Sequence, residues 1–181
     1  YLVGNLFEDG EESFIYRKKQ QAFSTGYTFA NPEKNLVARR LTFGYDYSNL
    51  KFKQATEKDF EDVDVDPEEV SRNPALLAED RAFSGPFTAL QIIEPDFVSL
   101  AFLDRFDRVE DYNLGNEFLA RFTLAADALG STNDTLLFSF SDSDGLSLSP
   151  TSFLRGKAGI SSRLDSAGLE NSLISADVRY Y

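Results

Sequence analysis

Residues 36–54 read L-V-A-R-R-L-T-F-G-Y-D-Y-S-N-L-K-F-K-Q, and two kinds of side chain alternate along this stretch. A β-strand directs successive side chains to opposite faces. The alternation therefore predicts a strand with one apolar, aromatic face and one face of small, polar and charged residues. The first face consists of Val37, Leu41, Phe43, Tyr45 and Tyr47, and the second of Ala38, Arg40, Thr42, Gly44, Asp46 and Ser48.

Two classes of protein contain strands with this alternation. A soluble β-sandwich buries the large residues and exposes the polar ones. A transmembrane β-barrel turns its apolar side chains to lipid and its small or polar ones to the lumen, with aromatic residues at the membrane interface. The small residues of the polar face, and the aromatic residues toward one end of the stretch, favour the barrel.

Composition sets the limits on function. The chain has 181 residues, which suits a single domain spanning residues 1–181, and its net charge of -12 argues against nucleic acid as a partner. It contains no cysteine and no histidine, which excludes thiolate chemistry and the usual general base. No stretch is apolar enough for a membrane-spanning helix, so a membrane would have to be crossed by strands.

A second long strand precedes the first stretch. Residues 12–30 alternate in their second half, and the polar turn at residues 30–35 joins them to residues 36–54 in a predicted hairpin. The segment R-K-K-Q-Q at residues 17–21 is too charged for the interior of a bilayer. It predicts a strand that continues past the membrane or faces lipid headgroups.

Residues 55–86 differ from the strands around them. They are rich in carboxylates and interrupted by prolines, and we predict a long acidic loop of the extracellular kind. Asp62, Asp64 and Asp66 alternate like the first ligands of a calcium-binding EF-hand. However, Pro67 stands where that loop needs glycine, and Asn73 where it needs a bidentate glutamate, so we predict no such site.

Further strands are predicted at residues 87–94, 97–106, 116–127, 135–141, 152–163 and 172–181, with a turn at residues 142–145. The fold class is therefore all-β, an antiparallel transmembrane β-barrel or part of one, with about eight long strands. The residues expected to face lipid are Leu41, Phe43, Tyr45, Phe118, Phe122, Phe138 and Phe140.

Charges of both signs are expected on the opposite, lumen-side face, where they would pair with one another. They are Arg40, Asp46, Glu117, Arg121, Asp127, Asp177 and Arg179. No pair of carboxylates is singled out as an acid and a base, and barrel hydrolases that use serine need a histidine. We therefore predict a protein that is not an enzyme and has no cofactor or metal.

Two segments carry a resemblance to a known family. D-R-F-D-R-V-E-D-Y-N-L-G at residues 104–115, and the hairpin strand R-R-L-T-F-G-Y-D-Y at residues 39–47 with its following polar loop, resemble barrel domains of the BamA/TamA-type surface-antigen superfamily. The resemblance implies residence in the bacterial outer membrane and a role in protein insertion or export. Its implied partners are membrane lipid and client proteins. Barrels of that family have sixteen strands, so this chain would be part of one or a smaller barrel of eight.

The resemblance also implies a site. Leu154, Arg155 and Gly156 match the centre of an arginine-glycine motif that lies in a loop folded into the lumen. Arg155 would there pair with a carboxylate, and Glu117, Asp127 and Asp177 are the possible lumen charge partners. The alternative is that Arg155 simply lies on a strand. Two other functions stay open, a small structural or adhesin-like barrel and a soluble ligand-binding β-sandwich.

Overall fold

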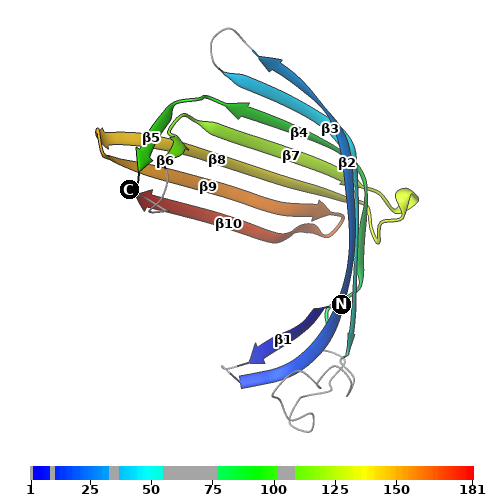
Figure 1. Ribbon diagram of the computed structural model, residues 1–181. Helices are drawn as coiled ribbons and strands as arrows, with labels where there is room; N and C mark the ends of the chain where they lie inside the picture. Colours follow the sequence, from blue (N-terminus) through cyan, green and yellow to red (C-terminus); the bar gives the residue numbers. More distant parts are fainter. Residues whose placement is uncertain (1, 9–10, 33–36, 55–76, 102–108) are drawn as a thin grey trace.

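The computed structural model describes residues 2–8, 11–32, 37–54, 77–101 and 109–181, which form an all-β protein (Figure 1). An eight-stranded antiparallel sheet has the strand order β1-β2-β3-β4-β7-β8-β9-β10, and a two-stranded sheet lies beside it. The strands of the large sheet are β1 (Leu2–Glu8), β2 (Glu11–Pro32), β3 (Ala38–Gln54), β4 (Arg81–Ile93), β7 (Glu117–Ala125), β8 (Thr135–Ser149), β9 (Ser152–Asp165) and β10 (Gly168–Tyr180). The small sheet consists of β5 (Phe97–Ala101) and β6 (Val109–Asn113), and a 3-10 helix, η3 (Asp127–Leu129), follows β7.

The register carries the two faces of β3 across to the neighbouring strands. Directly opposed residues point to the same side of an antiparallel pair. Phe43 on β3 is opposite Tyr27 on β2 and Thr88 on β4, whereas its neighbour Thr42 is opposite Thr28 and Ala89. The seven residues expected to face lipid all lie on the side of Phe43.

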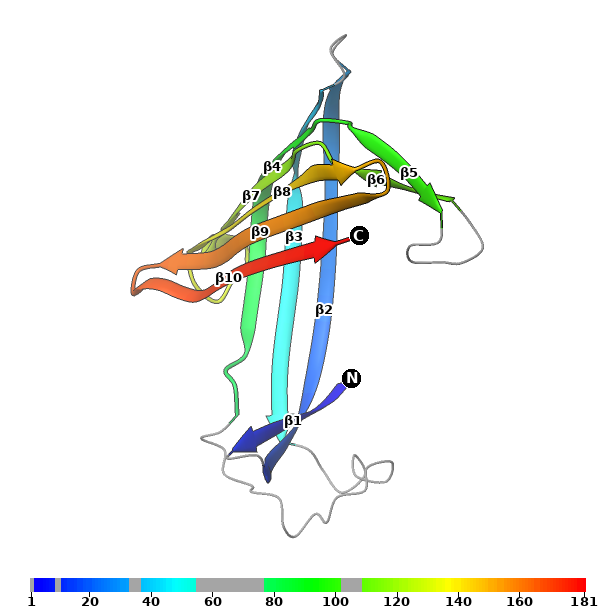
Figure 2. The same cartoon turned by 90° about the vertical axis from the view of Figure 1, so that its left-hand side faces the viewer.

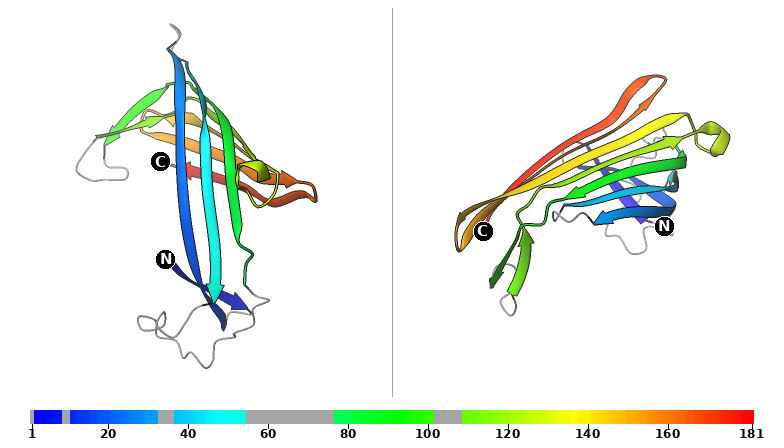
Figure 3. Two further views of the ribbon diagram at one scale, coloured as in Figure 1. Left: turned by 90° about the vertical axis from the view of Figure 1, so that its right-hand side faces the viewer. Right: turned by 90° about the horizontal axis from the view of Figure 1, so that it is seen from above.

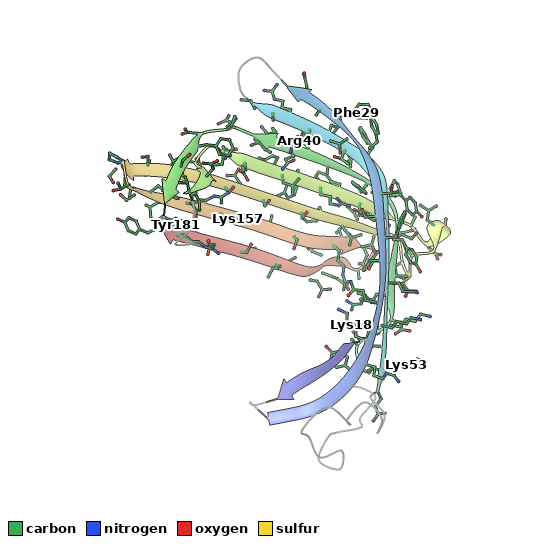
Figure 4. All side chains as sticks on the ribbon, viewed as in Figure 1. Lys18, Phe29, Arg40, Lys53, Lys157 and Tyr181 are labelled. Atoms are coloured by element: carbon green, nitrogen blue, oxygen red, sulfur yellow. The ribbon has the colours of Figure 1, made fainter. Side chains whose placement is uncertain are left out.

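The sheet is strongly curved and twisted, and β2 and β3 run steeply across the direction of β8, β9 and β10 (Figures 1, 2 and 3). Phe29 and Lys53 project from the outside of the curve, and Lys18 and Arg40 from the inside (Figure 4). We call the side of Phe29 and Phe43 the convex face, and the side of Arg40 and Asp46 the concave face.

Large apolar side chains of the convex face are exposed. Tyr27 is 69% exposed, Phe29 57% and Phe43 51%, and Ile174 and Val178 on β10 are exposed as well. In the part of the chain that the structure describes, the buried apolar residues are few: Phe87, Leu114, Ala120, Ala125 and Phe153. The large sheet therefore has no apolar core on its convex side.

The β5–β6 hairpin packs against one end of β8 and β9. Tyr112 contacts the rings of Phe153 and Tyr181 at 5.3 and 5.2 Å, and Phe153 is 1% exposed. Leu114 lies against Gly145 so closely that a Cβ atom there would come within 2.6 Å of its backbone. Two of the five buried apolar residues, Leu114 and Phe153, thus lie where the hairpin meets the large sheet. No helix among the described residues is long and apolar enough to cross a membrane.

The structure confirms an all-β fold with a long-stranded antiparallel sheet and corrects the barrel, because the sheet is not closed. β1 and β10 are the two edges. β1 pairs only with residues 11–18 of β2, so among the described residues the part of β2 from Gln20 to Pro32 has β3 as its one neighbour. β10 pairs only with β9.

Three local predictions need correction. Residues 97–101 leave the large sheet because they pair with β6, which lies inside the charged segment 104–115; residues 102–106 are outside the described part. The predicted turn at residues 142–145 lies within β8, because these residues pair with residues 155–158 of β9. Of the predicted loop 55–86, residues 55–76 are outside the described part and residues 81–86 belong to β4. Pro86 is tolerated there because β4 pairs with β7 only from Phe87 onward.

Candidate functional site

A polar network on the concave face has Asp46 at its centre. Arg121 on β7 donates from Nη2 to both carboxylate oxygens, at 2.8 Å to Oδ1 and 2.6 Å to Oδ2. Ser24 on β2 donates to Oδ1 at 2.7 Å, and Thr123 donates to Oδ2 at 3.2 Å. Donors from two strands, β2 and β7, thus converge on one carboxylate of β3, and the ion pair is a charge-assisted hydrogen bond of the strong kind.

Glycine makes this convergence possible. Asp46 on β3 is directly opposite Gly85 on β4, so no side chain of β4 stands between the carboxylate and Arg121 on β7. A Cβ atom at Gly85 would lie 1.8 Å from the carbonyl oxygen of Leu124, so a larger residue is excluded. Because Gly85 has no side chain, the carboxylate of Asp46 on β3 can reach Arg121 on β7 across β4.

Phe87 supports the guanidinium of Arg121. Its ring lies 3.6 Å from the guanidinium carbon, in the geometry of a cation–π contact. The ring also covers Gly44, where a Cβ atom would come within 2.5 Å of it, and approaches Gly26, the direct partner of Gly44. Phe87 is thus packed between the backbones of Gly26 and Gly44 and the guanidinium of Arg121. This packing explains how an apolar ring is buried on a polar face.

A hollow of about 380 Å³ opens beside the network. Hydroxyl groups and charged groups of the concave face line it, and Ser139 on β8 is opposite Ser161 on β9. At its far wall Arg163 pairs with Glu170 at 2.9 Å. The charges on both walls have partners within the protein, and Leu137 and Phe138 add an apolar part to the lining.

The structure places Leu154, Arg155 and Gly156 within β9, so this segment is a strand and not a loop folded inward. A regular register with β8 and β10 holds it there. Glu117 lies on the same face with its Oε2 atom 3.7 Å from Arg155, and it accepts a hydrogen bond from Asn113 at 2.9 Å.

Of the other two suggested partners of Arg155, Asp177 on β10 shares the concave face but pairs with another cation. It lies directly opposite Lys157 and accepts a hydrogen bond from Arg179 at 3.0 Å. Asp127 is in η3, outside the sheet. The remaining charges predicted for the lumen side, from Arg40 to Arg179, do share the concave face.

Three members of the network, Phe87, Ser24 and Thr123, were not singled out by sequence reasoning. Phe87 was expected only as the first residue of a strand, and Ser24 and Thr123 only as residues within predicted strands. Alternation does place Ser24 on the face of Asp46, but only the strand order brings Arg121, 75 residues away, into the same network. The described residues contain no cluster of three side chains that could hold a metal ion.

Comparisons of this chain with family models, with curated proteins and with solved structures find no match. The chemistry that the concave face offers is that of a polar surface on which ion pairs join side chains of different strands.

Proposed function

We propose that this chain forms part of the wall of a transmembrane β-barrel in the bacterial outer membrane, and that its role is not enzymatic. The observation that carries the proposal is the division of one sheet into an apolar, exposed convex face and a polar, internally paired concave face. A barrel wall in a membrane requires this division, because lipid contacts one side and water the other.

The convex face supports the proposal because no other part of the described chain covers it. Among the described side chains, exposed apolar residues of the convex face extend from β2 to β10, which is far more than the patches a soluble monomer leaves uncovered. A soluble β-sandwich would cover it with a second sheet, and the second sheet among the described residues has only two strands, which pack at the end of β8 and β9. Acyl chains would cover the convex face without any further protein.

The lengths of the strands also support the proposal. A tilted strand crosses the hydrocarbon layer in about 9–11 residues. Each strand of the large sheet except β1 has at least the nine residues of β7. The two open edges would have to be paired in lipid, since unpaired backbone groups there cost several kcal/mol each. The barrel would therefore include further strands, from another segment of polypeptide or from a second copy.

Protein insertion or export is the role that the family resemblance implies, and we include it in the proposal. The open edges favour it over a purely structural role. A strand with unpaired N–H and C=O groups can add a strand of another chain by backbone hydrogen bonding. The segment of β2 from Gln20 to Pro32 and the outer edge of β10 are long enough to serve as such templates.

Membrane residence is tested by comparing neighbouring residues of β3. We expect the chain to fold in detergent micelles or vesicles and not in plain buffer. Phe43→Lys on the convex face should block this folding, whereas Thr42→Lys on the concave face should permit it. A soluble, folded monomer of Phe43→Lys in plain buffer would refute the membrane proposal and favour the β-sandwich.

The insertion role needs a separate experiment. Vesicles that contain the folded protein are mixed with an unfolded outer-membrane barrel, and the folding rate of that barrel is followed by its shift in electrophoretic mobility. We expect folding to be faster than in empty vesicles. Equal folding rates in vesicles with and without the protein would contradict the insertion role and favour a structural or adhesin-like role for the barrel.

A further inference from the structure

Polarity changes in a regular order along the convex face of β3. Phe43 is followed on that face by Tyr45, Tyr47, Asn49, Lys51 and Lys53. The hydroxyl of Tyr45 is hydrogen-bonded to Ser84 at 2.8 Å, and the hydroxyl of Tyr47 accepts from Asn49 at 3.3 Å. The face thus passes from hydrocarbon through phenols and an amide to ammonium groups.

The adjacent strand repeats this order in register. On β2, Phe23 is opposite Tyr47, Gln21 is opposite Asn49, and the last two pairs consist only of cations. These pairs are Lys19 with Lys51 and Arg17 with Lys53. The four cations, which we call the basic cluster, line a hollow of about 250 Å³ on the convex side.

The concave face changes in the opposite sense at the same level of the strands. Asp46 and Ser48 are followed there by Leu50 and Phe52, and the ring of Phe52 contacts Tyr16 at 5.9 Å. A strand whose two faces stay in the same two media along its length keeps its apolar residues on one face and its polar residues on the other. The exchange between the two faces indicates that β2 and β3 leave the apolar medium near residue 48 and continue into water.

The distance from the apolar band fits the headgroup layer. Four residues separate Tyr47 from Lys51, which is about 13 Å along a strand and about 10 Å along the membrane normal at the tilt usual in barrels. Lys51 and Lys53 are exposed, whereas the nearby carboxylate of Asp80 accepts a hydrogen bond from the backbone N–H of Phe52 at 2.7 Å. The ammonium groups are thus presented outward on the same face as the apolar band.

We propose that the basic cluster binds the phosphate groups of anionic lipids whose acyl chains lie along the apolar band of β2 and β3. This inference rests on the proposed function, because it requires the convex face to contact lipid. Two rows of cations can hold a phosphate between the strands, while Phe23 and Tyr47 contact the lipid below its headgroup. Each cation near an anionic surface strengthens binding about fivefold, from about 1 kcal/mol per charge.

The test is a titration of the protein folded in neutral detergent micelles with phosphatidylglycerol, phosphatidylcholine or inorganic phosphate, with bound ligand read by native mass spectrometry. We expect phosphatidylglycerol to bind more tightly than phosphatidylcholine. The double variant Lys51→Gln/Lys53→Gln should weaken its binding by about 25-fold, the product of two fivefold losses.

The matched control is Lys18→Gln/Lys157→Gln, which removes the same charge from the concave face. It should change the binding of phosphatidylglycerol less than twofold. Equal losses in the two double variants, or equal binding of the two lipids, would refute the inference. Inorganic phosphate that binds as tightly as phosphatidylglycerol would refute it too, because the site would then take free anions.

Failure of the inference and failure of the proposed function give different results. A protein that folds as a soluble monomer without micelles contradicts the membrane proposal before any lipid is added. A protein that needs micelles and shows no preference for phosphatidylglycerol contradicts the lipid site alone.

Discussion

The convex and concave faces share one backbone but differ in what satisfies their side chains. On the concave face, partners within the protein do so: Asp46 receives hydrogen bonds from Arg121, Ser24 and Thr123. On the convex face, Phe29 and Ile174 are mostly exposed although they are apolar. We infer that contacts within the protein stabilise the concave face, whereas the surrounding medium, lipid in our proposal, stabilises the convex face.

This contrast predicts how substitutions act. A change on the concave face removes a defined partner, so its cost depends on local geometry. If the convex face contacts lipid, as proposed, a change there alters transfer into lipid and its cost depends on depth in the membrane. The following predictions test that contrast by unfolding the protein reversibly in lipid vesicles and comparing free energies of unfolding.

The largest effect is expected for Phe87, the buried ring beside Arg121 on the concave face. Phe87→Ala should reduce the free energy of unfolding by about 3–5 kcal/mol, because it empties the space over Gly44 and removes the support of Arg121. Phe87→Leu is the control and should cost clearly less. A loss below about 1 kcal/mol for Phe87→Ala would contradict the packing role of the ring.

The next prediction compares neighbours on β8. Phe138→Lys on the convex face should cost about 2–4 kcal/mol, as for a lysine near the middle of a bilayer, whereas Ser139→Lys on the concave face should cost about 0–1 kcal/mol. The lysine at position 139 would extend into the hollow beside Arg121. Equal costs at the two positions would remove the distinction between the faces.

A smaller effect is expected for the central ion pair. The side chains of Arg121 and Asp46 are 36% and 24% exposed, so Asp46→Asn or Arg121→Gln should cost about 1–3 kcal/mol, less than a fully buried pair. The double variant completes a thermodynamic cycle, and we expect a coupling energy of at least about 0.5 kcal/mol. Strict additivity would show that the two side chains act independently.

The smallest effect is expected for Arg155. Its contact with Glu117 at 3.7 Å is long, and both side chains are more than one-third exposed. Arg155→Ala should therefore cost less than about 0.5 kcal/mol, in the range of surface pairs. A loss above about 1 kcal/mol would restore the idea that Arg155 is confined in a lumen.

Alternation alone was sufficient to predict much of the fold. It correctly assigned residues 38–48 to two faces and placed Phe118, Phe122, Phe138 and Phe140 together with Phe43, because side-chain direction follows directly from strand parity. Residence in lipid stays a prediction, since a face of a soluble sheet alternates in the same way.

Strand order and exact boundaries could not be predicted in this way. D-S-D-G at residues 142–145 has the composition of a turn, yet pairing with β9 overrides it, and Gly145 serves the contact with Leu114 instead. Because β5 and β6 form a separate sheet, β4 pairs with β7 in the large sheet. No local sequence pattern predicts this pairing. The network around Asp46 depends on that neighbourhood, so its members were predicted as separate charges and not as a site.

Within the described part of the chain, the edge of β2 from Gln20 to Pro32 and the outer edge of β10 have no pairing strand, and this has a consequence for handling the protein in solution. Folding of one chain is a first-order process, whereas pairing of two exposed edges is second-order in protein concentration. Exposed strand edges are templates for association with other chains. Dilution during refolding should therefore favour single folded chains, and raising the concentration should convert them into ladders of joined sheets even while micelles are in excess.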